Sequence, residues 1–161
     1  MTHRKSQRGA QTPVRAILQE ESSLQAKVRD GLDAMKKVDR KLIDAPLRSS
    51  FGDSLDIDTA LRLGHEQENR WDYLLGHKPN KTVIALEPHS ANEKEIAVII
   101  AKRDAARDQL APHMKSGERI AAWLWVASGK VHLANTEKAR ILLDQNGIRF
   151  VGPKVLRKHL P

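Results

Sequence analysis

Apolar residues in the first third of the chain recur at the period of a helix. From Val14 to about Ile43 they lie three, four or seven residues apart, which predicts one long amphipathic helix over residues 14–45. Ala45-Pro46 should end it, because the residue before a proline disfavours helical backbone. The same steps of four and three resemble a coiled-coil seam, weakened by Gly31. We favour packing of this helix on its own domain, with a homodimer formed through it as the alternative. The apolar positions are Ile17, Leu24, Val28, Leu32, Met35, Val38 and Leu42.

The rest of the chain alternates between helical and strand periods. The pattern predicts, in order, a helix from Ser54 or Asp56 to about Asn69, strands at 71–76 and 82–88, a helix from Asn92 to about Leu110, strands at 119–127 and 130–134 joined by a turn at Ser128-Gly129, a helix from Thr136 to Asn146 and a strand at 148–151. A hairpin followed by a helical crossover points to a mixed sheet. We therefore expect residues 50–161 to form one α/β domain, with about five strands flanked by helices.

Composition sets the class of protein. At 161 residues the chain is long enough for one domain with a proper core, and with 40% hydrophobic but only 4% aromatic residues that core must be mostly aliphatic. The absence of cysteine excludes disulfides and thiolate metal sites and suits a reducing cytoplasm. No apolar run is long enough to span a membrane. Residues 1–13 hold no large apolar residue after Met1, so we expect a disordered basic arm.

The net charge of +8 is concentrated at the two ends of the chain. Residues 1–49 carry 11 Lys and Arg against 6 Asp and Glu, residues 50–112 carry 8 against 11, and residues 113–161 carry 9 against 3. Basic flanks around an acidic centre suit a protein that holds phosphates outside and a cation inside, although a merely soluble basic surface has the same composition. The candidate nucleic-acid contacts are Arg4, Lys5, Arg8, Lys154, Arg157 and Lys158.

Two carboxylates fall on apolar strands, where they need a partner. Burying a lone carboxylate costs several kcal/mol unless it meets a cation, a metal or hydrogen-bond donors. Asp72 and Glu87 should converge if the hairpin is in register, with Glu68 near them from the end of the preceding helix. Oxygen donors of this kind suit Mg²⁺ or Mn²⁺. The alternative is a structural ion pair with Lys102, Arg103 or Arg62.

The order of these elements and residues resembles the PD-(D/E)XK nuclease superfamily, in which adjacent strands present an Asp and then a Glu-x-Lys. The matching positions are Asp72, Glu87 and His89, with Glu68 standing for a helix carboxylate, and the resemblance covers about residues 54–151. It implies a restriction-endonuclease-like fold with three strands before the crossover helix. Only one strand pair is predicted there, and His89 replaces the family's Lys. Either His89 or Lys102 would then stand at the position that activates water.

Two functions follow from this resemblance. The first is metal-dependent hydrolysis of DNA or RNA phosphodiesters, with Asp72, Glu87, His89 and Lys102 as catalytic residues and Glu68, Asp72 and Glu87 as metal ligands. The second is a catalytically inactive fold of the same type, used to bind nucleic acid or protein. Trp123 and Trp125 share one face of their strand and are predicted to pack in the core rather than to stack on bases.

Overall fold

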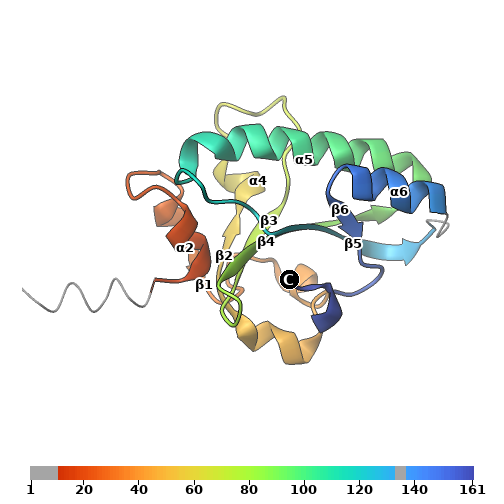
Figure 1. Ribbon diagram of the computed structural model, residues 1–161, viewed down its shortest axis with the longest axis horizontal. Coiled ribbons are helices and arrows are strands. Elements are labelled where there is room, and N and C mark those ends of the chain that lie inside the picture. Colours follow the sequence, from red (N-terminus) through yellow and green to blue (C-terminus); the bar gives the residue numbers. More distant parts are fainter. Residues whose placement is uncertain (1–10, 133–136) are drawn as a thin grey trace, which may run out of the picture.

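A computed structural model of the chain describes residues 11–132 and 137–161. These residues build one mixed sheet with helices on its faces (Figure 1), which confirms the predicted α/β class, with six strands in place of about five. The strands are β1 (Arg29–Asp30), β2 (Phe51–Asp56), β3 (Tyr73–His77), β4 (Thr82–Ala91), β5 (Ala122–Val131) and β6 (Ile148–Phe150). The α-helices are α2 (Pro13–Ile17), α3 (Lys37–Arg40), α4 (Ile57–Ala60), α5 (Ile96–Leu110) and α6 (Glu137–Gln145). Short 3-10 helices are η1 (Gln25–Lys27), η2 (Ala45–Ser50), η3 (Glu93–Glu95), η4 (Ala111–His113) and η5 (Arg157–His159).

The sheet keeps the order of the sequence from one edge to the other. Strands β1 to β4 form an antiparallel meander, and β4, β5 and β6 run parallel to one another. A parallel pair needs a crossover connection, and helix α5 supplies the one between β4 and β5. Helix α6 then connects β5 to β6. The antiparallel half and the parallel half therefore meet at β4, the strand that carries Glu87.

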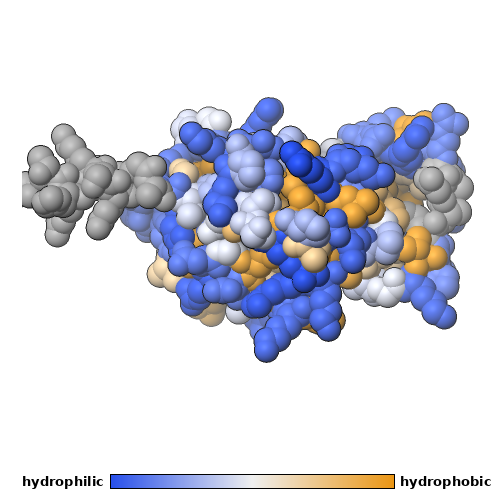
Figure 2. Space-filling view, turned by 90° about the horizontal axis from the view of Figure 1, so that it is seen from below, coloured by the Kyte–Doolittle hydropathy of each residue, from blue (hydrophilic) through white to orange (hydrophobic). Residues whose placement is uncertain are grey.

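Each face of the sheet has its own apolar core. One core lies under α2, α4, α5 and α6 and contains Trp71, Ile99 and Trp123. The other lies under residues 32–47 and the C-terminal segment, and it contains Met35 and Val155. Figure 1 places α5 on one side of the sheet and the C-terminal segment on the other. The lower side of the molecule is mostly hydrophilic, with small hydrophobic areas between the polar side chains (Figure 2).

The long helix predicted over residues 14–45 was wrong. Helix α2 ends at Ile17, and turns, the two-residue strand β1 and the four-residue helix α3 follow it. Gly31 has a φ of +54°, outside the helical region, as it passes from β1 into the next turn. Most of the apolar residues still enter the core: Leu24 and Val28 pack on one face of the sheet and Met35 on the other, whereas Val38 is exposed. A coiled-coil seam made from them would require their removal from the chain's own interior.

The second predicted helix was also wrong over most of its length. Residues 51–56 form strand β2, and only Ile57–Ala60 are helical, with the Asp56 carboxylate capping the backbone N–H of Thr59 at 3.0 Å. Pairing with both β1 and β3 gives β2 more backbone hydrogen bonds than one short helical turn could. With β2 and the two-residue strand β1, four antiparallel strands of the described chain precede the crossover helix.

The elements predicted from the most regular hydrophobic periods in the sequence are present in the structure. Strands β3 and β4 form the predicted hairpin. Asn92 caps the 3-10 helix η3 by accepting from the Lys94 N–H at 3.1 Å, α5 follows η3 directly, and α6 and β6 are present as predicted. The turn predicted at Ser128-Gly129 was wrong, because β5 continues through both residues to Val131. A shift in the pairing of β4 with β5 between His89 and Ala91 accommodates the positive φ of Gly129.

Candidate functional site

Glu87 is the centre of a cluster of ionisable side chains on the α5 side of the sheet. Its side chain is 0% exposed, and both of its oxygens are engaged. Oε1 accepts a hydrogen bond from the backbone N–H of Asp72 at 2.9 Å. Oε2 is contacted by the Lys102 ammonium and lies 3.5 Å from His89 Nδ1. A carboxylate with three donors around it can remain charged in an apolar core.

The hairpin register and the crossover helix bring these residues together. Tyr73 pairs with Leu86 in the β3–β4 ladder, which puts Asp72 opposite Glu87. The carbonyl oxygen of Asp72 accepts from the Ile57 N–H at 2.9 Å, so the start of α4 holds the entry to β3 in place. Lys102 reaches Glu87 from α5, which crosses this face of the sheet. The hairpin is therefore in the register that the prediction required, with Asp72, which immediately precedes β3, beside Glu87 on β4.

The Asp72 carboxylate has a different environment from that of Glu87. Among the described residues it accepts no hydrogen bond, and only its backbone is engaged. Burial, followed by the negative charge of Glu87, raises the pKa of Asp72 to about 7, while Lys102 acts in the opposite direction. Asp72 thus holds a proton up to near-neutral pH in the absence of another cation.

His89 occupies the position where the resemblance expects a lysine. Its Nε2 hydrogen-bonds with the Glu95 carboxylate at 2.8 Å, and its backbone oxygen accepts from Trp125 Nε1 at 3.3 Å. The hydrogen bond with Glu87 and then that with Glu95 raise the pKa of His89, against the effect of burial. Glu95 was not among the predicted site residues. Glu95 lies four residues after the end of β4, in the acidic 3-10 helix η3 that directly precedes α5. This position is the feature of the sequence that could have identified it.

Glu68 does not join the cluster. Its carboxylate pairs with His65 on an exposed loop, so the predicted three-carboxylate metal site is not formed. Throughout residues 11–132 and 137–161, no group of three or more His, Asp or Glu side chains is placed to hold a metal ion. Of the expected cationic partners, Lys102 pairs with Glu87, whereas Arg62 and Arg103 pair with Asp58 and Asp104.

Asp72 and Glu87 are two residues of the cluster that could offer oxygen ligands to a divalent cation of the Mg²⁺ type. Such an ion is usually held by one or two carboxylates, with water and substrate phosphate as its other ligands. Asp72 offers a carboxylate without a hydrogen-bond donor among the described residues, and Glu87 lies across the hairpin from it. A second carboxylate ligand would require Lys102 to release Glu87 Oε2.

The predicted phosphate contacts of the C-terminal segment lie on the side of the sheet opposite the cluster. Lys154, Arg157 and Lys158 belong to the C-terminal segment, in which Val155 packs into the core on the opposite face. Arg4, Lys5 and Arg8 lie outside the described residues. The predicted C-terminal cations therefore do not lie beside Glu87.

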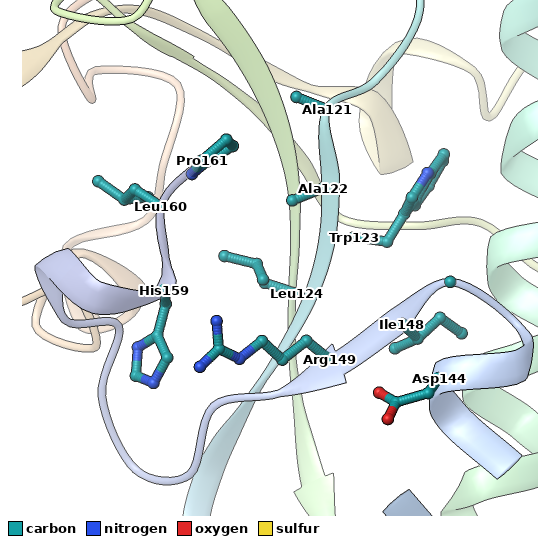
Figure 3. A pocket seen from close by; sticks show the side chains of 11 residues that line it. Ala121, Ala122, Trp123, Leu124, Asp144, Ile148, Arg149, His159, Leu160 and Pro161 are labelled. Carbon is teal, nitrogen blue, oxygen red and sulfur yellow. The ribbon is translucent and has the colours of Figure 1, made fainter. Parts of the chain in front are cut away.

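Trp123 and Trp125 are core residues, as predicted. Trp123 meets Trp71 edge to face at 5.2 Å, and Trp125 meets Phe150 at 4.9 Å. A cavity of about 340 Å³ opens beside Trp123, at the start of β5 and along β6. In Figure 3, Arg149 and His159 lie together on one side of this cavity, and Trp123 points away from them. His159 Nδ1 accepts from the Leu156 N–H at 2.8 Å, so its ring closes the last helical turn.

Comparisons of the chain with models of protein families, with curated proteins and with solved structures find no match. Of the helices in the described part of the chain, none has both the length and the apolar character needed to cross a membrane.

Proposed function

We propose that the chain is a metal-dependent nuclease-like protein that hydrolyses phosphodiester bonds of DNA or RNA. The observation that carries the proposal is the convergence of Asp72, Glu87, His89 and Lys102 on one point of the sheet. The strand order supports it. Strands β2, β3 and β4 are antiparallel, and α5 then crosses to the parallel strand β5, as the resemblance to PD-(D/E)XK nucleases expects.

Each residue has a role that its surroundings favour. Asp72 and Glu87 would hold Mg²⁺ or Mn²⁺, and the metal, when bound, supplies Lewis-acid stabilisation of the charge that develops on the phosphate. Lys102, freed from Glu87, would neutralise a phosphate oxygen as a point charge. His89 keeps its proton to higher pH than a free imidazole, because its pKa is raised. It is therefore better suited to protonate a leaving oxygen than to remove a proton from water.

The second candidate is a catalytically inactive fold of this type that binds nucleic acid or protein. The observation in its favour is the state of Glu87, which is fully buried and already neutralised by Lys102. An ion pair of that kind has a structural role without any metal, because removing either partner leaves an uncompensated buried charge.

One experiment separates the two candidates. The melting temperature of metal-free protein is measured at pH 8 with and without millimolar Mg²⁺ or Mn²⁺, because a ligand that binds only the folded state raises it. The variants are Asp72→Asn and, as a matched control, Asp33→Asn at an exposed position outside the cluster. Cleavage of labelled DNA and RNA is followed in the same samples.

We expect both metals to stabilise the parent and the Asp33→Asn control, and expect Asp72→Asn to lose the metal response and any cleavage together. A parent protein with neither a metal response nor cleavage would refute hydrolysis and leave the inactive binding fold. Metal-dependent cleavage that survives in Asp72→Asn would place the active site elsewhere.

A further inference from the structure

A second cavity lies on the same side of the sheet as the Glu87 cluster. Its volume is about 740 Å³, and it is enclosed by the C-terminal half of α5, residues 111–121, the start of β5 and Gly147. Four of its lining side chains are cationic and only two are anionic, so the cavity has an excess of positive charge. The cations are Arg103, Arg107, Lys115 and Arg119, and the anions are Asp108 and Glu118.

Arg103 is held rigidly in the wall of this cavity. Its guanidinium carbon lies 5.9 Å from the centroid of the Trp123 ring, and its side chain is only 15% exposed. On the other side it meets Gly147, where a Cβ would lie 2.9 Å from Nη2. Nη1 pairs with Asp104 at 3.0 Å, but within the described residues the buried Nε–H has no hydrogen-bond partner. The positive charge of this guanidinium, fixed beside the cavity, favours an oxyanion there.

The other three cations are uncommitted. In the part of the chain that the structure describes, the side chains of Arg107, Lys115 and Arg119 make no ion pair and no hydrogen bond. Arg107 extends from α5, whereas Lys115 and Arg119 extend from the connection to β5. Cations that converge from two elements without carboxylate partners favour an anionic ligand larger than a single oxyanion.

The cavity is close to the cluster. Lys102 and Arg103 are consecutive on α5, and Trp123 lies two residues before Trp125, which pairs with Glu87 in the β4–β5 ladder. Two residues of a strand span about 7 Å. An extended phosphate chain with one group at Glu87 would therefore place another group near the cavity.

We propose that this cavity binds two neighbouring backbone phosphates of the nucleic-acid strand whose scissile phosphodiester lies at Asp72 and Glu87. The proposal rests on the proposed function, and it assigns the strand to the α5 side of the sheet. The basic C-terminal segment, which the sequence favoured for this task, lies on the other side. Contacts of this kind position a strand without reading its bases.

The test measures binding without metal, so it does not depend on catalysis. The affinity of the full chain for a fluorescein-labelled mixed-sequence DNA duplex is followed by anisotropy in EDTA over a range of salt concentrations. The test variant is Arg107→Gln/Arg119→Gln, and the charge-conserving variant is Arg107→Lys/Arg119→Lys. Lys37→Gln/Lys41→Gln, at two exposed positions at the start of α3 and just after its end, is the charge-matched control. Lys154→Gln/Lys158→Gln reports on the C-terminal segment. A melting curve of each variant verifies that it folds.

We expect the Arg→Gln pair to reduce the slope of log affinity against log salt by about 1.8, which is two phosphate contacts on duplex DNA. The lysine pair should restore the slope, and the α3 control should keep it. An unchanged slope in the Arg→Gln pair, an equal loss in the α3 control, a loss only in the C-terminal variant, or no binding by the parent at low salt would overturn the proposal. If the slope falls as expected while Mg²⁺ and Mn²⁺ leave the melting temperature unchanged, the phosphate site stands and the nuclease proposal fails.

Discussion

At the scale of single residues, the two strand carboxylates differ in how their charge is compensated. Glu87 is fully buried but receives the Asp72 N–H, the Lys102 ammonium and the His89 ring. Asp72 is less buried and, among the described residues, receives no donor on its carboxylate. The cluster therefore has one satisfied carboxylate and one that an added cation would stabilise, which is the asymmetry expected of a site that awaits a ligand.

The raised pKa of Asp72 should make the metal-free protein less stable as the pH rises. Between pH 4 and 7 the unfolded chain has already lost this proton, whereas the folded chain keeps it, because the folded pKa is about 7. The folded state thus binds more protons, and the free energy of unfolding should fall across this window by at most about 4 kcal/mol. Urea denaturation in EDTA at a series of pH values measures it.

Asp72→Asn provides the comparison for this pH profile. The amide cannot ionise, so the variant should lack the Asp72 part of the decline. The raised pKa of His89 stabilises the folded state below pH 6.5, and that contribution is lost as the pH rises through the folded pKa. Because this second decline is shared by parent and variant, their difference isolates Asp72. Parallel profiles of the two proteins would show that Asp72 titrates normally.

At the scale of secondary structure, the sequence predicted correctly those elements whose hydrophobic period is unbroken. The prediction failed for elements whose structure depends on contacts between residues far apart in the chain. The hairpin β3–β4 and the helix α5 were found from alternation and capping, and so the pairing of Asp72 with Glu87 could be predicted. Strand β2 was missed because Asp53 interrupts its apolar pattern. That carboxylate is buried because it accepts the backbone N–H groups of Val14 and Arg15, each at 3.0 Å, from 39 and 38 residues away. A local sequence pattern cannot predict a contact between residues so far apart in the chain.

Removing the Asp53 carboxylate should therefore release α2 from the sheet. Asp53→Ala leaves the N–H groups of Val14 and Arg15 without an acceptor, at a cost of about 2 kcal/mol in the free energy of unfolding. Asp53→Asn keeps one acceptor and should cost less. The control is Asp30→Ala, whose carboxylate is 85% exposed and pairs with Arg15 at the surface, where ion pairs contribute little.

Urea denaturation of these three variants and the parent gives the comparison. Gly76→Ala offers a second approach to the same contact, because a Cβ at Gly76 would lie 2.0 Å from Asp53 Oδ1 and force the carboxylate away from α2. If Asp53→Ala were no less stable than Asp30→Ala, α2 would be held by its apolar contacts alone.

At the scale of the whole molecule, two groups of cations in the described part of the chain lie on opposite sides of the sheet. The cations of the second cavity lie on the α5 side with the Glu87 cluster, and the C-terminal cations lie on the other. The sequence predicts the net charge and its concentration at the two ends of the chain. It does not predict on which side of the sheet each group of cations lies, because that depends on which face of the sheet each connection crosses. A single strand at Glu87 would meet the first group and not the second.

The N-terminal cations are the remaining predicted phosphate contacts, and their contribution should be separable from that of the proposed cavity site. Deleting residues 1–10 removes Arg4, Lys5 and Arg8 but retains α2, whose Val14 and Ile17 are buried. The melting temperature should stay unchanged, while the salt slope of duplex binding should fall by at most about 2.7, which is three phosphate contacts. Full-length protein with all three cations changed to Gln is the matched control and should show the same slope as the deletion.

When the deletion is combined with Arg107→Gln/Arg119→Gln, the two reductions in slope should add, because contacts on separate groups release separate counterions. An equal slope in the parent and the deletion would assign the phosphate contacts to the folded domain alone.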